Sequence, residues 1–135
     1  MEEKIILCVN ALIKKDNKIL LVKRVESDNE GGLWSIPGGT VEESEALEDA
    51  LSREIFEELG ISNLKYNFFD IIEIFNNKTR ILAFYFYTEI NDNIDIKLAH
   101  NELSDYSWFD CSYDIDEDLA FNQNIIINKF ITKKL

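Results

Sequence analysis

One helix-like segment among strand-like segments is the feature that most constrains the fold of this chain. Between residues 44 and 59, Leu47, Leu51 and Ile55 recur at intervals that place them on one face of an α-helix. An amphipathic helix must bury its apolar face against another element. Because the neighbouring segments are strand-like, we expect this helix to pack against a sheet.

The ends of this helix carry recognisable signals. Ser44 is expected to cap the first turn, where Glu45 and Glu48 would be favourable near the positive end of the helix. Gly60 can adopt the left-handed conformation that commonly ends a helix. The helix is therefore predicted to end at Leu59.

Strand-like segments rich in β-branched and aliphatic residues lie on both sides of the helix. The expected strands are residues 5–13, 18–25, 33–36, 64–75 and 79–89, a weaker one at 94–98 and a short one at 107–111. A turn or short helical piece at 114–120 and a terminal helix at 121–132 follow. This order predicts an α/β (α+β) fold in which a mixed β-sheet is sandwiched between helices. The chain shows no linker or repeat, so residues 1–135 are expected to form a single domain.

The formal net charge of −12 limits the partners. An acidic surface repels nucleic-acid backbones and anionic membranes, so no nucleic acid and no membrane is expected as a partner. The start of the chain is acidic and unlike a secretory signal, which predicts a cytoplasmic protein. The only cysteines, Cys8 and Cys111, make no disulfide or zinc pattern, and the single His100 argues against a histidine-rich metal site.

Three glutamates extend the apolar face of the helix towards its end. On a helical wheel of about 100° per residue, Glu54, Glu57 and Glu58 occupy the arc of the buried leucines one or two turns later. Partly buried, such like charges would repel each other or take up protons. A hard divalent cation would remove the repulsion and suits oxygen ligands. The alternative is that the helix tip projects past the sheet and leaves the glutamates in water.

The residues from Gly39 to Ile61 read GTVEESEALEDALSREIFEELGI. This segment resembles the signature of the Nudix hydrolase family, G-x5-E-x7-R-E-U-x-E-E-x-G-U, in which U is a bulky aliphatic residue. Every fixed position is filled, by Gly39, Glu45, Arg53, Glu54, Ile55, Glu57, Glu58, Gly60 and Ile61. A chance match has a probability on the order of 10⁻⁷ at average residue usage. The resemblance implies a Nudix-like fold with a catalytic loop-helix-loop at residues 39–61.

The resemblance also implies roles for these residues. Glu54, Glu57 and Glu58, with the Gly38 carbonyl, would hold one or more Mg²⁺ (or Mn²⁺) ions. Gly38 and Gly39 would allow a tight loop that presents this carbonyl.

Two further motif positions are expected to support the site. Arg53 would orient the carboxylates, and Glu45 would help to fix the loop and the helix. The alternative for both is an ordinary surface ion pair of little energetic value.

The implied reaction is attack of water on a phosphorus atom of a diphosphate, with metal ions neutralising the phosphate oxygens. In the family the general base is a glutamate of the helix or an acidic residue on a later loop. Glu102 stands six residues before Trp108 and fits the later position, with Asp105 as second candidate. Both could instead be plain exposed loop acids.

The substrate-binding candidates are Arg24 and Asn122. Arg24 resembles a family position that contacts the substrate, although it could simply be an exposed arginine at a strand end. Asn122 resembles a base-reading asparagine, and it could instead cap the terminal helix. An aromatic residue of the hairpin at 66–87 could stack on a base.

The implied function is a hydrolase of nucleotide-type small-molecule diphosphates. A nucleoside triphosphate pyrophosphohydrolase of the nucleotide-pool-sanitising type is preferred, because the chain is short. Dinucleoside polyphosphates and ADP-ribose or nucleotide-sugar compounds are the alternative substrates, and a non-catalytic nucleotide-sensing module is the alternative function. A homodimer is possible, although no interface signal is visible.

Overall fold

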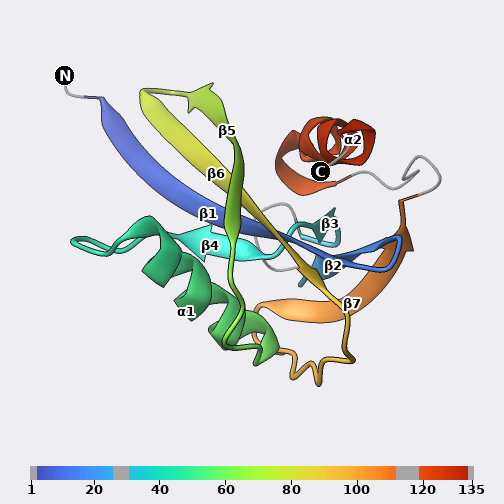
Figure 1. Cartoon of the computed structure of the whole chain (residues 1–135). Coiled ribbons are helices and arrows are strands. Elements are labelled where there is room, and N and C mark those ends of the chain that lie inside the picture. Colours follow the sequence, from blue (N-terminus) through green and yellow to red (C-terminus); the bar gives the residue numbers. More distant parts are fainter. Residues whose placement is uncertain (1–2, 26–30, 112–118, 134–135) are drawn as a thin grey trace.

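The computed structural model describes residues 3–25, 31–111 and 119–133. Within these ranges the chain forms seven strands, two α-helices and one 3₁₀ turn (Figure 1). In chain order these are β1 (Lys4–Lys15), β2 (Lys18–Arg24), β3 (Trp34–Ser35), β4 (Gly38–Thr40), α1 (Leu47–Leu59), β5 (Asn67–Asn76), β6 (Thr79–Ile90), β7 (Leu103–Asp110), η1 (Ala120–Asn122) and α2 (Asn124–Thr132).

The strands of the described residues form one mixed sheet in the order β3-β2-β1-β6-β5, with β7 paired to β2. The central pair is β1 and β6, which run parallel along their whole length. Strand β2 meets β1 only at their hairpin, where Lys14 faces Ile19. Further along β1, the short strand β4 pairs with residues 8–10 instead. The predicted mixed sheet is therefore confirmed, and it positions β4 beside the middle of β1.

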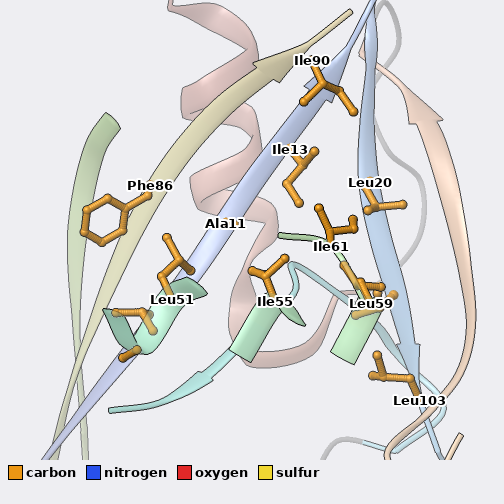
Figure 2. Close-up of a cluster of buried hydrophobic side chains, with 13 residues drawn as sticks. Ala11, Ile13, Leu20, Leu51, Ile55, Leu59, Ile61, Phe86, Ile90 and Leu103 are labelled. Atoms are coloured by element: carbon orange, nitrogen blue, oxygen red, sulfur yellow. The ribbon is translucent and has the colours of Figure 1, made fainter. Parts of the chain in front are cut away.

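The two helices lie on opposite sides of the β1–β6 pair (Figure 1). Side chains alternate between the faces of a strand, so Ala11 and Ile13 join the core beneath α1 while Leu12 joins the core beneath α2. Figure 2 shows Leu51 and Ile55 of α1 directed towards the strands, as the helical spacing predicts. The predicted sandwich of a sheet between helices is confirmed.

The start of α1 differs from the prediction. The N-cap residue is Ala46 and makes no side-chain cap hydrogen bond, so the cap predicted for Ser44 is wrong. Ser44 instead adopts a left-handed φ of 63° in the turn before the helix. The end is as predicted, since Gly60 has φ 70° and donates its N–H to the Phe56 carbonyl. A left-handed conformation at this position favours glycine.

Several predicted boundaries also move. Strand β5 begins at Asn67 rather than residue 64, and β7 begins at Leu103 rather than residue 107. The strand expected at residues 94–98 is wrong, because this segment is irregular. It is held instead by N–H bonds from Lys97 to the Leu59 carbonyl and from Ala99 to the Glu58 carbonyl. Backbone bonds to the end of α1 thus replace a strand ladder.

The C-terminal helix begins later than predicted. Residues 120–122 form the 3₁₀ turn η1, and α2 begins at Asn124 rather than residue 121. The turn or helical piece predicted at 114–120 lies mostly outside the described residues. No helix in the described ranges is long and apolar enough to cross a membrane.

Candidate active site

Strand β4 brings two glycines directly against α1. The N–H of Ala11 bonds the Pro37 carbonyl and that of Val41 bonds the Leu7 carbonyl, so the backbone groups of Gly38 point away from β1. The Gly38 N–H accordingly donates to Oε1 of Glu58 at 2.9 Å. The predicted tight loop at the glycines is wrong, because both lie in an extended strand.

Close approach, rather than turn formation, explains why glycine stands at these two positions. A Cβ on Gly38 would lie 2.0 Å from the Val9 carbonyl oxygen, and one on Gly39 would lie 2.3 Å from the Glu54 carboxylate. Neither position can hold a side chain without displacing its neighbour. Gly39 therefore lets α1 place the Glu54 carboxylate against β4, whereas Gly38 lets β4 lie close to β1.

Glu58 is the most buried of the acidic side chains of α1. It is only 5% exposed, and burial raises its pKa to about 8, against the opposing effect of the Gly38 N–H bond. Burial likewise raises the pKa of Glu54, although the Arg53 hydrogen bond opposes the shift. The negative charge of Glu102 adds to both shifts. Two carboxylates with raised pKa values therefore lie side by side, as the wheel predicts.

Glu57 behaves differently from the other two. Its side chain is 57% exposed, so the prediction of a partly buried cluster is wrong for this residue. For Glu57 alone, the alternative of a solvated glutamate on the helix surface describes the position correctly. Its i,i+4 contact with Arg53, at 3.4 Å, still keeps it on the same side of α1.

Arg53 contacts several acidic residues of the segment. Its Nε and Nη2 donate to the two carboxylate oxygens of Glu45 at 2.7 and 2.9 Å. Nη1 donates to Glu54 at 2.9 Å, and Nη2 also donates to the Thr40 carbonyl at 3.1 Å. The two-point contact lowers the pKa of Glu45 to about 2. This geometry favours the predicted orienting role over an ordinary surface ion pair.

A divalent cation fits the chemistry of this donor set. Carboxylate and carbonyl oxygens are the ligands that Mg²⁺ and Mn²⁺ prefer, and a cation would offset the cost of ionising the two buried glutamates. With the side chains as they stand, no group of three His, Cys, Asp or Glu among the described residues is gathered closely enough to hold an ion. Arg53 donates to Oε1 of Glu54 and the Gly38 N–H donates to Oε1 of Glu58, so one oxygen of each carboxylate is hydrogen-bonded within the protein in this arrangement.

Glu102 and Arg24 lie together beside the helix carboxylates. Arg24 faces Leu103 in the β2–β7 ladder, and the Val25 N–H donates to the Glu102 carbonyl. Glu102 is exposed and is near enough to Glu54 and Glu58 to act on their pKa values. The second candidate, Asp105, lies further along β7 opposite Lys23 and is also exposed. Among the predicted bases on the later loop, the structure brings Glu102 to the site.

A cavity of about 190 Å³ lies on the α2 face of the sheet and reaches the carboxylate site. Its lining includes Gly38, Gly39 and Glu58 on the side of α1, and Arg24 from the end of β2. Apolar side chains also line it, namely Ile36 directly after β3, Ile74 of β5, and Ile81 and Ala83 of β6. A flat apolar group could therefore bind beside the acidic helix.

Near η1, the residue that the sequence predicted as a substrate contact is adjacent to the residues that line the cavity. Asn122 is exposed, and the N-cap residue of α2 is Gln123, so the predicted cap is wrong. Gln123 and Phe121 line the cavity instead. Both Phe121 and Asn122 have a φ of 55°, a left-handed conformation that is uncommon for non-glycine residues. This backbone conformation sets the path of the chain through the 3₁₀ turn η1. A substrate contact by Asn122 stays a prediction.

Two cavity residues were missed for identifiable reasons. Gln123 carries no spacing signal, because helical periodicity starts after it. Tyr85 lies on the same sheet face as Asn10, its partner in the parallel ladder, so strand alternation could have located it. The expectation that an aromatic residue of the hairpin could meet a base is compatible with the position of Tyr85 in the cavity lining.

Comparison with known proteins gives matches over most of the chain. The NUDIX domain model matches residues 5–124. The 8-oxo-dGTP diphosphatase of Buchnera aphidicola subsp. Schizaphis graminum is 38% identical over 76 residues, which cover 56% of this chain and 58% of that protein. The matched stretch therefore spans little more than half of that relative. The nucleoside triphosphatase NudI of Escherichia coli O81 is 35% identical over 121 residues, which cover 80% of this chain and 82% of that protein.

A solved structure shows the same architecture. The crystal structure of a MutT NUDIX hydrolase from Burkholderia pseudomallei superposes with a TM-score of 0.82. The two proteins are 26% identical, and the superposition covers 93% of this chain and 98% of the other.

Proposed function

Because this chain belongs to the NUDIX family, we propose that it is a metal-dependent hydrolase that cleaves the diphosphate linkage of nucleoside diphosphate derivatives. Its preferred substrates would be nucleoside triphosphates, cleaved as in nucleotide-pool sanitising. The observation that carries this proposal is the cavity, whose lining extends from apolar strand residues to Gly38 and Glu58. A base in the cavity would leave the phosphates beside the acidic helix.

Glu54, Glu57, Glu58 and the Gly38 carbonyl are the proposed ligands of Mg²⁺ or Mn²⁺. A bound divalent cation would supply positive charge that neutralises the phosphate oxygens and makes water more acidic. Arg53 would hold Glu54 in place through its bond at 2.9 Å, while Glu45 holds Arg53 from the other side. These two residues position the site rather than contact the substrate.

Glu102 is the proposed general base. A water oxygen forms a bond to one phosphorus, the bridging P–O bond breaks, and the proton of the water passes to the Glu102 carboxylate. Glu102 is exposed and close to the helix carboxylates, so water and phosphate can both reach it. A helix glutamate remains the alternative base, as in other members of the family.

Substrate contacts are proposed for Arg24, and at the cavity margin for Asn122. The Arg24 guanidinium lies 5.1 Å from the centre of the Phe121 ring, and both residues line the cavity. This cation–π contact fixes the arginine where it can meet a phosphate or a base. Asn122 is exposed beside Phe121, so its contact would be with an outer part of the substrate.

The printed names of the relatives support nucleoside triphosphates as the substrate class, since they describe a diphosphatase of 8-oxo-dGTP and a nucleoside triphosphatase. Dinucleoside polyphosphates and ADP-ribose or nucleotide-sugar compounds are the alternative substrates. A non-catalytic nucleotide-sensing module is the alternative function. Both Glu54 and Glu58 are present beside β4, and Glu58 accepts a hydrogen bond from the Gly38 N–H, which favours the enzyme. Further proposals are a cytoplasmic location and no nucleic-acid or membrane partner; a homodimer remains possible.

The test is a panel of nucleoside triphosphates, dinucleoside polyphosphates and ADP-ribose, incubated with Mg²⁺ or Mn²⁺, with product release followed over time. The proposal expects triphosphates to give a monophosphate and pyrophosphate, and expects chelation to abolish turnover. Binding of nucleotides without turnover in either metal would favour the sensing module. Faster turnover of ADP-ribose than of any triphosphate would favour the alternative substrate class.

A further inference from the structure

Gln123 and Tyr85 form a buried polar pair in the wall of the cavity. Gln123 is 4% exposed and Tyr85 is 3% exposed, and both belong to the cavity lining. The Ile36 backbone N–H donates to Oε1 of Gln123 at 2.8 Å. A backbone N–H can only donate, so this bond fixes which end of the amide is oxygen.

The fixed amide determines what the pair presents to the cavity. With Oε1 held by Ile36, Nε2 faces Tyr85 and donates to its hydroxyl oxygen at 3.4 Å. The tyrosine therefore accepts from Gln123, and its own proton is available to donate elsewhere. Among the described residues, neither the Tyr85 O–H nor the second N–H of Gln123 has an acceptor. Two buried donors thus adjoin the cavity without an acceptor among the described residues.

We propose that Tyr85 and Gln123 select substrates whose base places a carbonyl oxygen in this cavity. The proposal rests on the proposed function and deepens it by naming the chemistry of the base. A carbonyl oxygen has two lone pairs and can accept from both donors. An exocyclic amino group in the same place would bring donors against donors and leave the buried pair unsatisfied.

The rest of the lining fits a base held in this orientation. Ile74, Ile81 and Ala83 give the cavity apolar walls suited to the faces of a ring. Gly38 and Glu58 also line it, so a base within it would leave its phosphates near the acidic helix. One edge of the base is then read by the buried pair.

Inosine and adenosine triphosphates test this inference most sharply, because they differ only in the edge that carries the 6-carbonyl or the 6-amino group. With Mg²⁺, kcat/KM for inosine triphosphate should exceed that for adenosine triphosphate at least about tenfold. Tyr85→Phe keeps the ring and removes one donor, so the ratio should fall towards one. Tyr87→Phe is the matched control, because Tyr87 lies two residues along β6 and lines a different pocket.

Gln123→Glu provides a second variant. A glutamate can still accept from the Ile36 N–H, but its other oxygen accepts rather than donates. This oxygen would therefore accept a hydrogen bond from the Tyr85 O–H, and neither side chain of the pair would donate to a carbonyl group. The ratio of the two kcat/KM values should fall at least as far as in Tyr85→Phe.

The outcomes separate this inference from the proposed function. Equal kcat/KM values for the two triphosphates in the wild-type protein, or a ratio unchanged by both variants, would overturn the base selection while leaving the hydrolase intact. Absence of turnover would overturn the hydrolase. In that case the ratio of dissociation constants for inosine and adenosine monophosphates, measured by calorimetry, decides the base selection with the same expected direction.

Discussion

Gly39 lies so close to Glu54 that a Cβ at Gly39 would stand 2.3 Å from the Glu54 carboxylate carbon. The strand therefore limits where this carboxylate can be, and Arg53 holds it from the other side at 2.9 Å. Gly39→Ala should displace Glu54 while the fold survives, because the obstructing atoms belong to the far end of a side chain. We expect kcat to fall about 100-fold, since a misplacement of about 1 Å can have that effect.

Gly60 offers a contrasting variant, because it lies at the end of α1 and its replacement by alanine should affect stability rather than kcat. Its φ of 70° is left-handed, and a Cβ there would lie 3.0 Å from Cβ of Lys97. Gly60→Ala should lower the free energy of unfolding by about 1–2 kcal/mol and leave kcat within about twofold. Urea unfolding and initial rates of both variants check the pair. Equal losses of activity in the two variants would contradict a specific role for Gly39.

Glu45 should affect activity through its contact with Arg53. Glu45→Gln removes the charge from the two-point contact with the guanidinium, which then holds Glu54 less firmly. Loss of such a supporting contact typically reduces activity 10- to 100-fold, and we expect a fall in this range. Glu42→Gln is the matched control, because Glu42 is exposed and lies 3.7 Å from Arg53. Its rate should stay within about twofold of the wild type.

Glu58 should make the stability of the metal-free protein depend on pH. Its pKa rises from an ordinary value of 4.5 to about 8 on folding, so the folded state retains a proton that the unfolded state has lost. This contribution to stability is complete below pH 4.5 and is lost as the pH rises towards 8. Thermal melts from pH 5 to 8 with EDTA should therefore show a falling Tm attributable to this group.

Glu58→Gln is the control for this effect, because the glutamine cannot titrate. The fall in Tm between pH 5 and 8 should be smaller in this variant than in the wild type. Added Mg²⁺ should raise the wild-type Tm most at pH 8, where ionised Glu58 benefits from a counter-charge. An identical pH dependence in both proteins would show that Glu58 does not titrate in this range.

The candidate bases can be separated by a pair of variants. Glu102→Gln should lower kcat by about 100-fold or more, because loss of a general base typically has effects of this size. Asp105→Asn should leave kcat within about twofold, since Asp105 lies along β7 opposite Lys23. Steady-state kinetics with a nucleoside triphosphate check both. A larger loss from Asp105→Asn would transfer the role to that residue.

Regular periodicity made much of the fold predictable. The spacing of Leu51 and Ile55 located the buried face of α1, and runs rich in β-branched and aliphatic residues located β1, β2 and β6. The prediction failed where local signals competed with long-range contacts. Ser44 is a good capping residue, but the turn before α1 is shaped by the contact between Glu45 and Arg53. Residues 94–98 alternate like a strand, although backbone bonds to the end of α1 hold them.

The residues of the candidate site likewise fall into those that the sequence predicts and those that it does not. The positions of Glu54 and Glu58 could be predicted from the helical wheel, because the burial of a helix face is a periodic property. The exposure of Glu57 and the closeness of Gly39 to α1 depend on how β4 pairs with β1, which no local pattern encodes. The placement of Gln123 depends on the left-handed backbone of the preceding turn. Residues that define the cavity were therefore harder to predict than those of the acidic helix.

The central claim is that the carboxylates of α1 form a metal-dependent hydrolytic site. It is tested most directly by the Mg²⁺-dependent release of pyrophosphate from nucleoside triphosphates by the wild type and Glu57→Gln. Glu57 is exposed, so its replacement should leave Tm unchanged while it removes metal charge from the site. We predict turnover at least about 100-fold lower in the variant and no turnover of the wild type in EDTA. Near-normal turnover by a folded Glu57→Gln variant, or full wild-type turnover in EDTA, would contradict the claim.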